Sequence, residues 1–442
     1  MGRKPLDVDK IVMELVMTED VSLKKKLAKK IADMAYKKGI YSASIHEFYI
    51  ARGKNEFSGF TVPAINLRSM TYDLARAIFR VAKRNSSGAF IFEIAKSEMG
   101  YTAQAPVEYS AVVLAAAIRE GFSGAVFIQG DHFQANAKKF QENPDKEIEG
   151  LKALISEAVG AGFYNIDIDS STLVDLTKTD IKKQQYLNYE VCAKLTQFIR
   201  RIEPKGITVS VGGEIGEVGH KNSTVEDLRA FMSGYQNRLR KGLIGISKIS
   251  VQTGTSHGGV VLPDGSVAQV KLDFDTLKNL SEISRSEFGL GGAVQHGAST
   301  LPAEAFHKFP ECQACEVHLA TEFQNMIYES KHFPKGLKDK IYAWLKDNAA
   351  SEKKEGETEE QFFYKTRKKA LGPFKKDIMG LEPEVRDAIA LEVENKFDFL
   401  FKQLNAVNNK DLVDKYVALK RVISRKRKEE EAQVVHDTEG AD

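Results

Sequence analysis

The residues of this sequence that could do chemistry are histidines and carboxylates that follow short apolar runs. Five successive runs end in such residues, namely Asp131 with His132, Asp169, Glu214, His257 and His296. Three neutral imidazoles with one open coordination position are typical of a catalytic zinc site. A single histidine is more often a hydrogen-bonded core residue, and an aspartate after a strand often caps the next helix. Because three of only nine histidines share this placement, we predict one divalent metal ion on His132, His257 and His296, with Zn²⁺ expected and another divalent metal as the alternative.

Two glycine-rich stretches beside these residues add an anion-binding signal. Residues 254–259 read Gly-Thr-Ser-His-Gly-Gly, and residues 297–300 read Gly-Ala-Ser-Thr. Small residues leave backbone N–H groups and hydroxyls free to surround a phosphate. One such loop usually reflects only the conformational needs of a turn. Two of them next to metal-type histidines predict that a phosphorylated molecule binds near the metal.

A repeated pattern between residues 59 and 328 would bring these residues together. In each repeat a short apolar run is followed by polar or glycine residues and then by apolar residues at helical spacing. Eight strands are expected to begin near Thr61, Ala89, Ala125, Asn165, Ile207, Lys248, Ala293 and Glu316. Intervening helices are expected over residues 70–83, 106–120, 147–161 and 224–241, among others.

This alternation predicts an α/β fold. Apolar strands separated by amphipathic helices form parallel sheets, and eight repeats favour closure into a (β/α)8 TIM barrel, with an open doubly wound sheet as the alternative. In a barrel the loops after the strands converge at one rim, so the five strand ends would share one site.

The barrel is predicted to occupy residues 56–330, with a segment on each side. Residues 1–55 are expected to form a helical N-terminal extension, with helices over 11–17 and 23–38. Residues 331–442 are expected to form a helical C-terminal extension, in which residues 384–404 have apolar positions at helical spacing. Such helices commonly cap a barrel or join subunits, so we expect a homo-oligomer.

Composition argues against several other classes of protein. The 64 basic and 61 acidic side chains are mixed along most of the chain, which disfavours a nucleic-acid partner. Three cysteines are too few for a disulfide framework and fit a reducing compartment. No apolar run is long enough for a membrane span, and no signal peptide is recognisable. A cytoplasmic protein without membrane or nucleic-acid partners is therefore expected.

The order of these motifs resembles that of the class II, metal-dependent fructose-bisphosphate and tagatose-bisphosphate aldolases. The similarity runs between residues 59 and 328. The matching motifs are Asp131-His132, Ile168-Asp169-Ser170-Ser171, Glu214-Ile215-Gly216, Gly254-Thr255-Ser256-His257-Gly258 and His296-Gly297-Ala298-Ser299.

The resemblance implies a role for each matching residue. The metal would be held by His132, His257 and His296, with Asp169 and Glu214 orienting these ligands or receiving the metal when it shifts. Asp131 would be the acid/base that handles the substrate's hydroxyl proton, and Glu217, on the loop after Glu214, a second acid/base. A sugar phosphate would contact Asn66, Gly258, Gly297, Ala298, Ser299 and Thr321. A monovalent cation could accompany the Zn²⁺. The implied reaction is reversible cleavage of a phosphorylated ketose to dihydroxyacetone phosphate and an aldehyde.

The last predicted strand departs from the family pattern. It reads His318-Leu319-Ala320-Thr321-Glu322 where the family has Asn-x-Asp-Thr-Asp, and Gln324 replaces an arginine that binds the distal phosphate. Arg68 or Lys96 could take over that role. His318 could also join Cys312 and Cys315 in a C-x-x-C-x-x-H metal clip, although two buried thiols are the preferred interpretation.

Two other functions remain as alternatives. One is a non-catalytic or regulatory barrel that binds a sugar phosphate as a subunit of an aldolase complex. The other is a metal-dependent hydrolase or isomerase on another barrel, which would predict different carboxylate and lysine positions.

Overall fold

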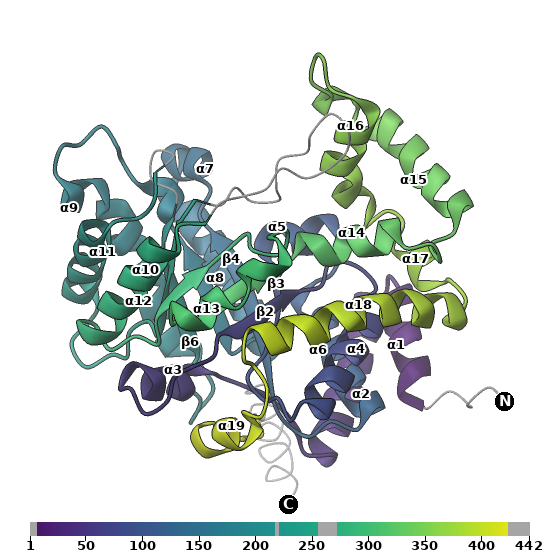
Figure 1. Ribbon diagram of the computed structural model, residues 1–442, viewed down its shortest axis with the longest axis horizontal. Helices are drawn as coiled ribbons and strands as arrows, with labels where there is room; N and C mark the ends of the chain where they lie inside the picture. The colour runs from purple at the N-terminus through teal and green to yellow at the C-terminus, as the bar shows by residue number, and fades with distance from the viewer. Residues whose placement is uncertain (1–6, 217–220, 255–271, 423–442) are drawn as a thin grey trace, which may run out of the picture.

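The computed structural model describes residues 7–216, 221–254 and 272–422, and within them nine parallel strands form one sheet (Figure 1). The strands are β1 (Ile40–Ala43), β2 (Val62–Asn66), β3 (Ile91–Ala95), β4 (Gly124–Gln134), β5 (Asn165–Asp169), β6 (Ser210–Gly216), β7 (Lys248–Val251), β8 (Ala293–Gln295) and β9 (Glu316–Leu319). Their order is β1-β4-β3-β2-β9-β8-β7-β6-β5, and β4 also pairs with β5. That last pairing closes β2 to β9 into an eight-stranded barrel, which confirms the predicted (β/α)8 fold and excludes the open sheet.

Helices surround the barrel. Those that follow its strands are α4 (Thr71–Arg84), α5 (Lys96–Tyr101), α6 (Pro106–Glu120), α7 (Ala137–Glu142), α8 (Pro144–Gly160), α9 (Ile181–Gln184), α10 (Tyr186–Ile202), α11 (Val225–Arg238), α12 (Phe274–Ser286), α13 (Lys308–Glu311) and α14 (Thr321–Glu329). Local signals set their ends: Pro106 occupies the first turn of α6, and Gly121 ends it with a left-handed φ of 61°. The predicted helices match these bounds closely.

Each strand separates two environments. On β3, Phe92 points outward and packs against Phe79 of α4, with ring centroids 5.0 Å apart. Glu93, the next residue, points into the barrel, where it lies in register with Asn66 of β2 and Gln129 of β4. Because neighbouring residues of a strand face opposite sides, apolar side chains fill the outer layer while polar ones enter the barrel.

The N-terminal segment differs in part from its prediction. Helices α1 (Asp7–Met17) and α2 (Val21–Lys37) form as expected and pack against α6. Residues 40–43, which were expected to be helical, instead form β1 and pair with the first half of β4. β4 pairs with β5 only from Gln129 onward, so the edge of the N-terminal half of β4 is free to pair with β1. A short helix, α3 (His46–Gly53), then covers the N-terminal end of the barrel.

The segment after β9 is helical, as predicted. It contains α15 (Lys335–Asn348), α16 (Glu359–Thr366), α17 (Lys375–Met379), α18 (Pro383–Gln403) and α19 (Lys410–Tyr416). α15 and α16 project from the barrel, and α18 returns along α4 (Figure 1). A buried ion pair of 3.0 Å between Arg386 and Asp73 joins α18 to α4, so this helix belongs to the barrel wall. No helix in the described ranges has the length and apolarity needed to cross a bilayer.

Candidate metal centre

An irregular end of β4 places two functional residues at the barrel rim. The pairing of β4 with β5 shifts between Gly130 and Phe133, and His132 has a left-handed φ of 39°. A Cβ at position 130 would lie 2.5 Å from the ring of Phe133, so glycine is required there. In a regular strand Asp131 and His132 would face opposite sides, and the bulge lets both reach the same site.

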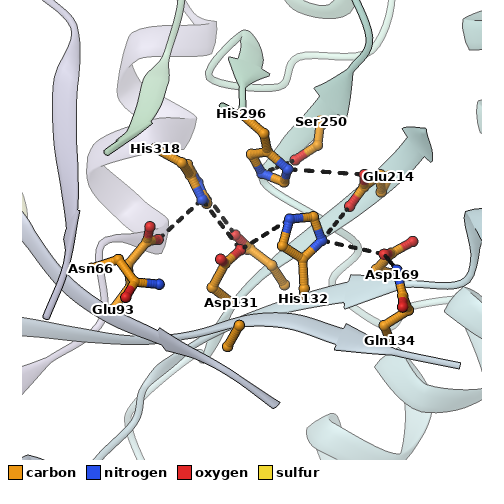
Figure 2. Close-up of polar contacts among 12 residues, drawn as sticks. Asn66, Glu93, Asp131, His132, Gln134, Asp169, Glu214, Ser250, His296 and His318 are labelled. Carbon is orange, nitrogen blue, oxygen red and sulfur yellow. Dashed lines mark hydrogen bonds and ion pairs between the residues drawn. The ribbon is translucent and has the colours of Figure 1, made fainter. Parts of the chain in front are cut away.

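The structure brings two of the three predicted imidazoles together. The ring centroids of His132 and His296 are 4.3 Å apart, and ligand atoms of Asp131, His132 and His296 all lie within 4.8 Å of one another (Figure 2). A mixed set of imidazole nitrogens and a carboxylate oxygen suits Zn²⁺. His257 lies outside the described residues, as do Gly258 and Glu217, so their predicted roles stay predictions.

Asp169 and Glu214 contact the same histidine, His132. The Nδ1 atom of His132 lies 3.2 Å from an oxygen of each carboxylate, and Glu214 also lies 3.9 Å from Nδ1 of His296. The hydroxyl of Ser171 donates a 2.6 Å hydrogen bond to Asp169 and fixes its orientation. His132, Asp169 and Glu214 thus form a second set of possible ligands beside the first.

The charges of this centre are strongly coupled. Burial and the neighbouring Asp169 raise the pKa of Glu214 to about 7. Burial raises the pKa of Asp131, but His132 and His318 outweigh it and hold this pKa well below its usual range. Asp131 is therefore ionised at neutral pH, as a metal ligand or proton acceptor must be.

His318 joins the site from β9, where sequence reasoning had considered it only for a cysteine clip. Its Nδ1 atom lies 3.1 Å from Glu93 and 3.2 Å from Asp131, and its Nε2 atom lies 2.6 Å from Glu316 (Figure 2 shows the first two). Cys312 instead donates to the carbonyl of Phe274, and among the described residues no group able to hold a metal contains a cysteine. The structure therefore favours the buried-thiol interpretation.

Next to His318, inside the barrel, lie buried charged side chains that sequence reasoning missed. Lys248 of β7 donates to Asp167 at 2.9 Å and to Glu316 at 2.6 Å, and all three side chains are buried. The only sequence signal was a charged residue inside an otherwise apolar strand, as with Glu93 in β3. We call Glu93, Asp131, Asp167, Lys248, Glu316 and His318 the inner cluster.

Comparison with known proteins adds independent evidence. Residues 53–401 match the family model described as fructose-bisphosphate aldolase class-II. The chain belongs to this family. A search of curated proteins found no match.

Solved structures share the fold of this aldolase-family chain at low sequence identity. A probable tagatose 6 phosphate kinase from Sinorhizobium meliloti 1021 has a TM-score of 0.55 at 16% identity, covering 80% of this chain and 99% of that one. A fructuronate-tagaturonate epimerase from Cohnella laeviribosi has a TM-score of 0.56 at 10% identity, covering 79% and 82%. A fructose-bisphosphate aldolase from Campylobacter jejuni is 18% identical, with a TM-score of 0.46 and coverage of 84% and 96%. At these identities the first two likenesses support the fold alone.

The predicted substrate-binding residues of this aldolase-family chain lie beside β2, β8 and β9. Ser299 accepts a hydrogen bond from the backbone N–H of Glu322 at 3.3 Å, in the first turn of α14, and Thr321 begins that helix. Asn66 ends β2 and donates to Glu98 at 2.5 Å. Gly297 has a left-handed φ of 66°, and Ala298 is fully buried. Of these residues, Ser299 and Thr321 lie at the N-terminus of α14, a suitable place for an anion.

Of the two cations considered for the distal phosphate, one points to this region. Arg68 pairs with Glu98 at 2.7 Å, and its Nη1 atom lies 3.4 Å from the hydroxyl of Thr321. Lys96 instead donates to the carbonyl of Gln134 and pairs with Glu147. Of the two, Arg68 is therefore the cation that lies beside a predicted substrate-binding residue.

Proposed function

We propose that this protein is a metal-dependent ketose-phosphate aldolase, which reversibly cleaves a phosphorylated ketose to dihydroxyacetone phosphate and an aldehyde. Membership of the class II family supports the aldolase chemistry. The observation that carries the proposal is the convergence of Asp131, His132 and His296 at one point of the rim.

The donor atoms at the rim fit a divalent cation such as Zn²⁺. A cation held by His132, His296 and the predicted ligand His257 would polarise the ketone carbonyl and stabilise the negative charge that develops on its oxygen. Asp169 and Glu214 hold Nδ1 of His132 at 3.2 Å and so orient this ring toward the centre of the site.

Asp131 would move the proton. When the carbon–carbon bond breaks, the substrate hydroxyl at the cleavage position loses its proton, and an ionised carboxylate within hydrogen-bond reach can accept it. In condensation the same carboxyl returns the proton to the new hydroxyl. Its depressed pKa supports the ionised starting state. Glu217 stays our prediction for the second acid/base.

The phosphate of the dihydroxyacetone half would bind near Ser299 and Thr321, where the α14 N-terminus offers backbone N–H groups. Arg68 would add a fixed positive charge for an anionic group of the substrate, because its Nη1 atom lies 3.4 Å from the hydroxyl of Thr321. The substrate proposed is accordingly a ketose phosphate, with a bisphosphate as the leading candidate.

The test couples metal content to cleavage by the full-length protein. Fructose 1,6-bisphosphate, tagatose 1,6-bisphosphate and the corresponding monophosphates are assayed with chelator, without chelator and after zinc is restored. We expect cleavage that chelation abolishes and zinc restores. His296→Ala should lower kcat/KM by about a thousand-fold, or ~4 kcal/mol, since it removes a metal ligand.

His307→Ala is the matched control, because His307 is half exposed and pairs only weakly with Glu311. It should keep both metal and activity. Cleavage that survives chelation would contradict the metal mechanism. Binding of a sugar phosphate without cleavage would favour the regulatory alternative, and conversion of a hexuronate instead of a sugar phosphate would favour an epimerase.

A further inference from the structure

The inner cluster contains a second group of possible metal ligands, beside the site of His132 and His296. Glu93 of β3, Asp131 of β4 and His318 of β9 place ligand atoms within 4.8 Å of one another. Their exposed fractions are 0%, 5% and 4%, so water reaches none of them freely. Three strands of the barrel thus aim polar side chains at one buried point.

The hydrogen bond on the far side of His318 sets its orientation. Nε2 of His318 lies 2.6 Å from Oε1 of Glu316, an oxygen that also accepts from Lys248 at 2.6 Å and from Gln129 at 2.8 Å. An oxygen with two such donors is an ionised acceptor, so Nε2 of His318 carries a proton. A carboxylate that accepts from one ring nitrogen while the other faces a metal is the usual arrangement for histidine ligands.

The other ring nitrogen has close neighbours but no hydrogen bond. Nδ1 of His318 lies 3.1 Å from Oε2 of Glu93 and 3.2 Å from Oδ1 of Asp131. Yet Nδ1 of His318, Oδ1 of Asp131 and Oε1 of Glu93 are all buried without a hydrogen-bond partner. Ligand bonds of about 2.0–2.2 Å put the donor atoms of one tetrahedral zinc ion roughly 3.3 Å apart. These spacings are those of ligands that face a shared cation.

The charge of the inner cluster favours the same occupant. Lys248 pairs with Asp167 and Glu316, which leaves the carboxylates of Glu93 and Asp131 without a lysine or arginine in contact among the described residues. The groups in contact with them that can carry a positive charge are imidazoles, His318 for both and His132 for Asp131. An imidazole that binds a metal is neutral and no longer offsets a buried carboxylate, which costs several kcal/mol when it is uncompensated. A divalent cation between Glu93 and Asp131 would offset both charges.

We propose that Glu93, Asp131 and His318 bind a second divalent transition-metal ion, Zn²⁺ or Mn²⁺, in the barrel interior. One imidazole and two carboxylates suit either ion. Asp131 lies between this inner site and the outer site of His132 and His296, since its Oδ1 atom is 3.2 Å from His318 and 3.9 Å from His132. The inner site goes beyond the proposed aldolase function, which needs only the outer cation.

Metal content of the full-length protein tests the proposal. After growth with zinc or manganese and dialysis, elemental analysis should give about two metal ions per chain. Glu93→Gln and His318→Gln should each lose about one ion and keep the outer one, whereas His296→Ala should lose the outer one. His46→Gln is the matched control, since His46 is equally buried but lies at the opposite end of the barrel, and it should keep both ions.

Anomalous diffraction from crystals of the unaltered protein, soaked in Mn²⁺ or Zn²⁺, gives a readout that does not depend on whether variants fold. A peak about 2.0–2.3 Å from Glu93, Asp131 and His318 would support the inner site. One metal ion per chain, retained in His318→Gln and absent from this position in the map, would overturn it and leave the aldolase proposal intact. Two ions without cleavage of any sugar phosphate would sink the aldolase proposal and support the inner site.

Discussion

The two ends of the barrel bury cationic side chains in opposite ways. At the N-terminal end, the fully buried Arg52 donates to the backbone carbonyls of Phe60 at 2.6 Å and of Gly291 and Ala314 at 3.1 Å. Nearby, burial and Arg200 lower the pKa of His46 to about 3. At the C-terminal side, burial lowers the pKa of His318, but Glu93 and Asp131 outweigh it and hold this pKa well above its usual range.

This contrast separates a structural end from a functional one. Backbone carbonyls accept four hydrogen bonds from Arg52, and His46 is neutral in the folded state. In the inner cluster, charged groups face charged groups and the carboxylates outnumber the lysine. A protein that needed only stability would gain little from so many buried charges, because desolvation offsets their attraction. Excess negative charge is what a site for cations requires.

Lys248→Met should have the largest effect on stability. Removing the ammonium group leaves the buried carboxylates of Asp167 and Glu316 without their lysine partner, which should lower the free energy of unfolding by about 3–5 kcal/mol. Urea denaturation at pH 7 in the presence of chelator measures the loss. A loss below about 1 kcal/mol, a size typical of exposed pairs, would show that the inner cluster is better solvated than its burial indicates.

Arg52→Met should lower the free energy of unfolding slightly less, by about 2–4 kcal/mol. The apolar chain fills similar space, but buried carbonyls of Phe60, Gly291 and Ala314 lose their donors. Metal content per folded chain should stay unchanged, because Arg52 donates to backbone carbonyls at the end of the barrel opposite the inner cluster. Elemental analysis alongside denaturation checks both points. A loss of metal would contradict the assignment of a purely structural role to the N-terminal end.

His46→Gln should change how stability depends on pH. In the folded protein the pKa of His46 is about 3, against an ordinary 6.5, so only the unfolded chain binds a proton there between these values. The contribution of His46 to the free energy of unfolding is fully present above pH 6.5. It is lost as the pH falls toward 3, by about 1.4 kcal/mol per pH unit. Between pH 7.5 and pH 5 the free energy of unfolding of the variant should therefore fall by about 2 kcal/mol less than that of the unaltered protein. Parallel denaturation curves at the two pH values test this, and equal losses would mean that His46 is protonated when folded.

Sequence reasoning predicted the barrel and much of its rim because both depend on local patterns. Strand and helix spacing identified the eight repeats, and the residues after each strand had to meet once the sheet closed. Asp131, His132, Asp169, Glu214 and His296 do meet there. The N-terminal strand was missed because four residues flanked by helices give almost no periodic signal, and only the free edge of the N-terminal half of β4 selects them.

The amino-acid sequence by itself determined the elements, their order and the residue types at the strand ends. Only the tertiary structure decided which way each strand residue faces, since a buried parallel strand is apolar on both sides and its pattern does not distinguish inside from outside. That choice gathers Glu93, Asp167, Lys248, Glu316 and His318 around one axis. The tertiary structure also decided the left-handed conformation of His132. Its ring reaches Asp169 and Glu214 because the bulge after Gly130 forms against β5.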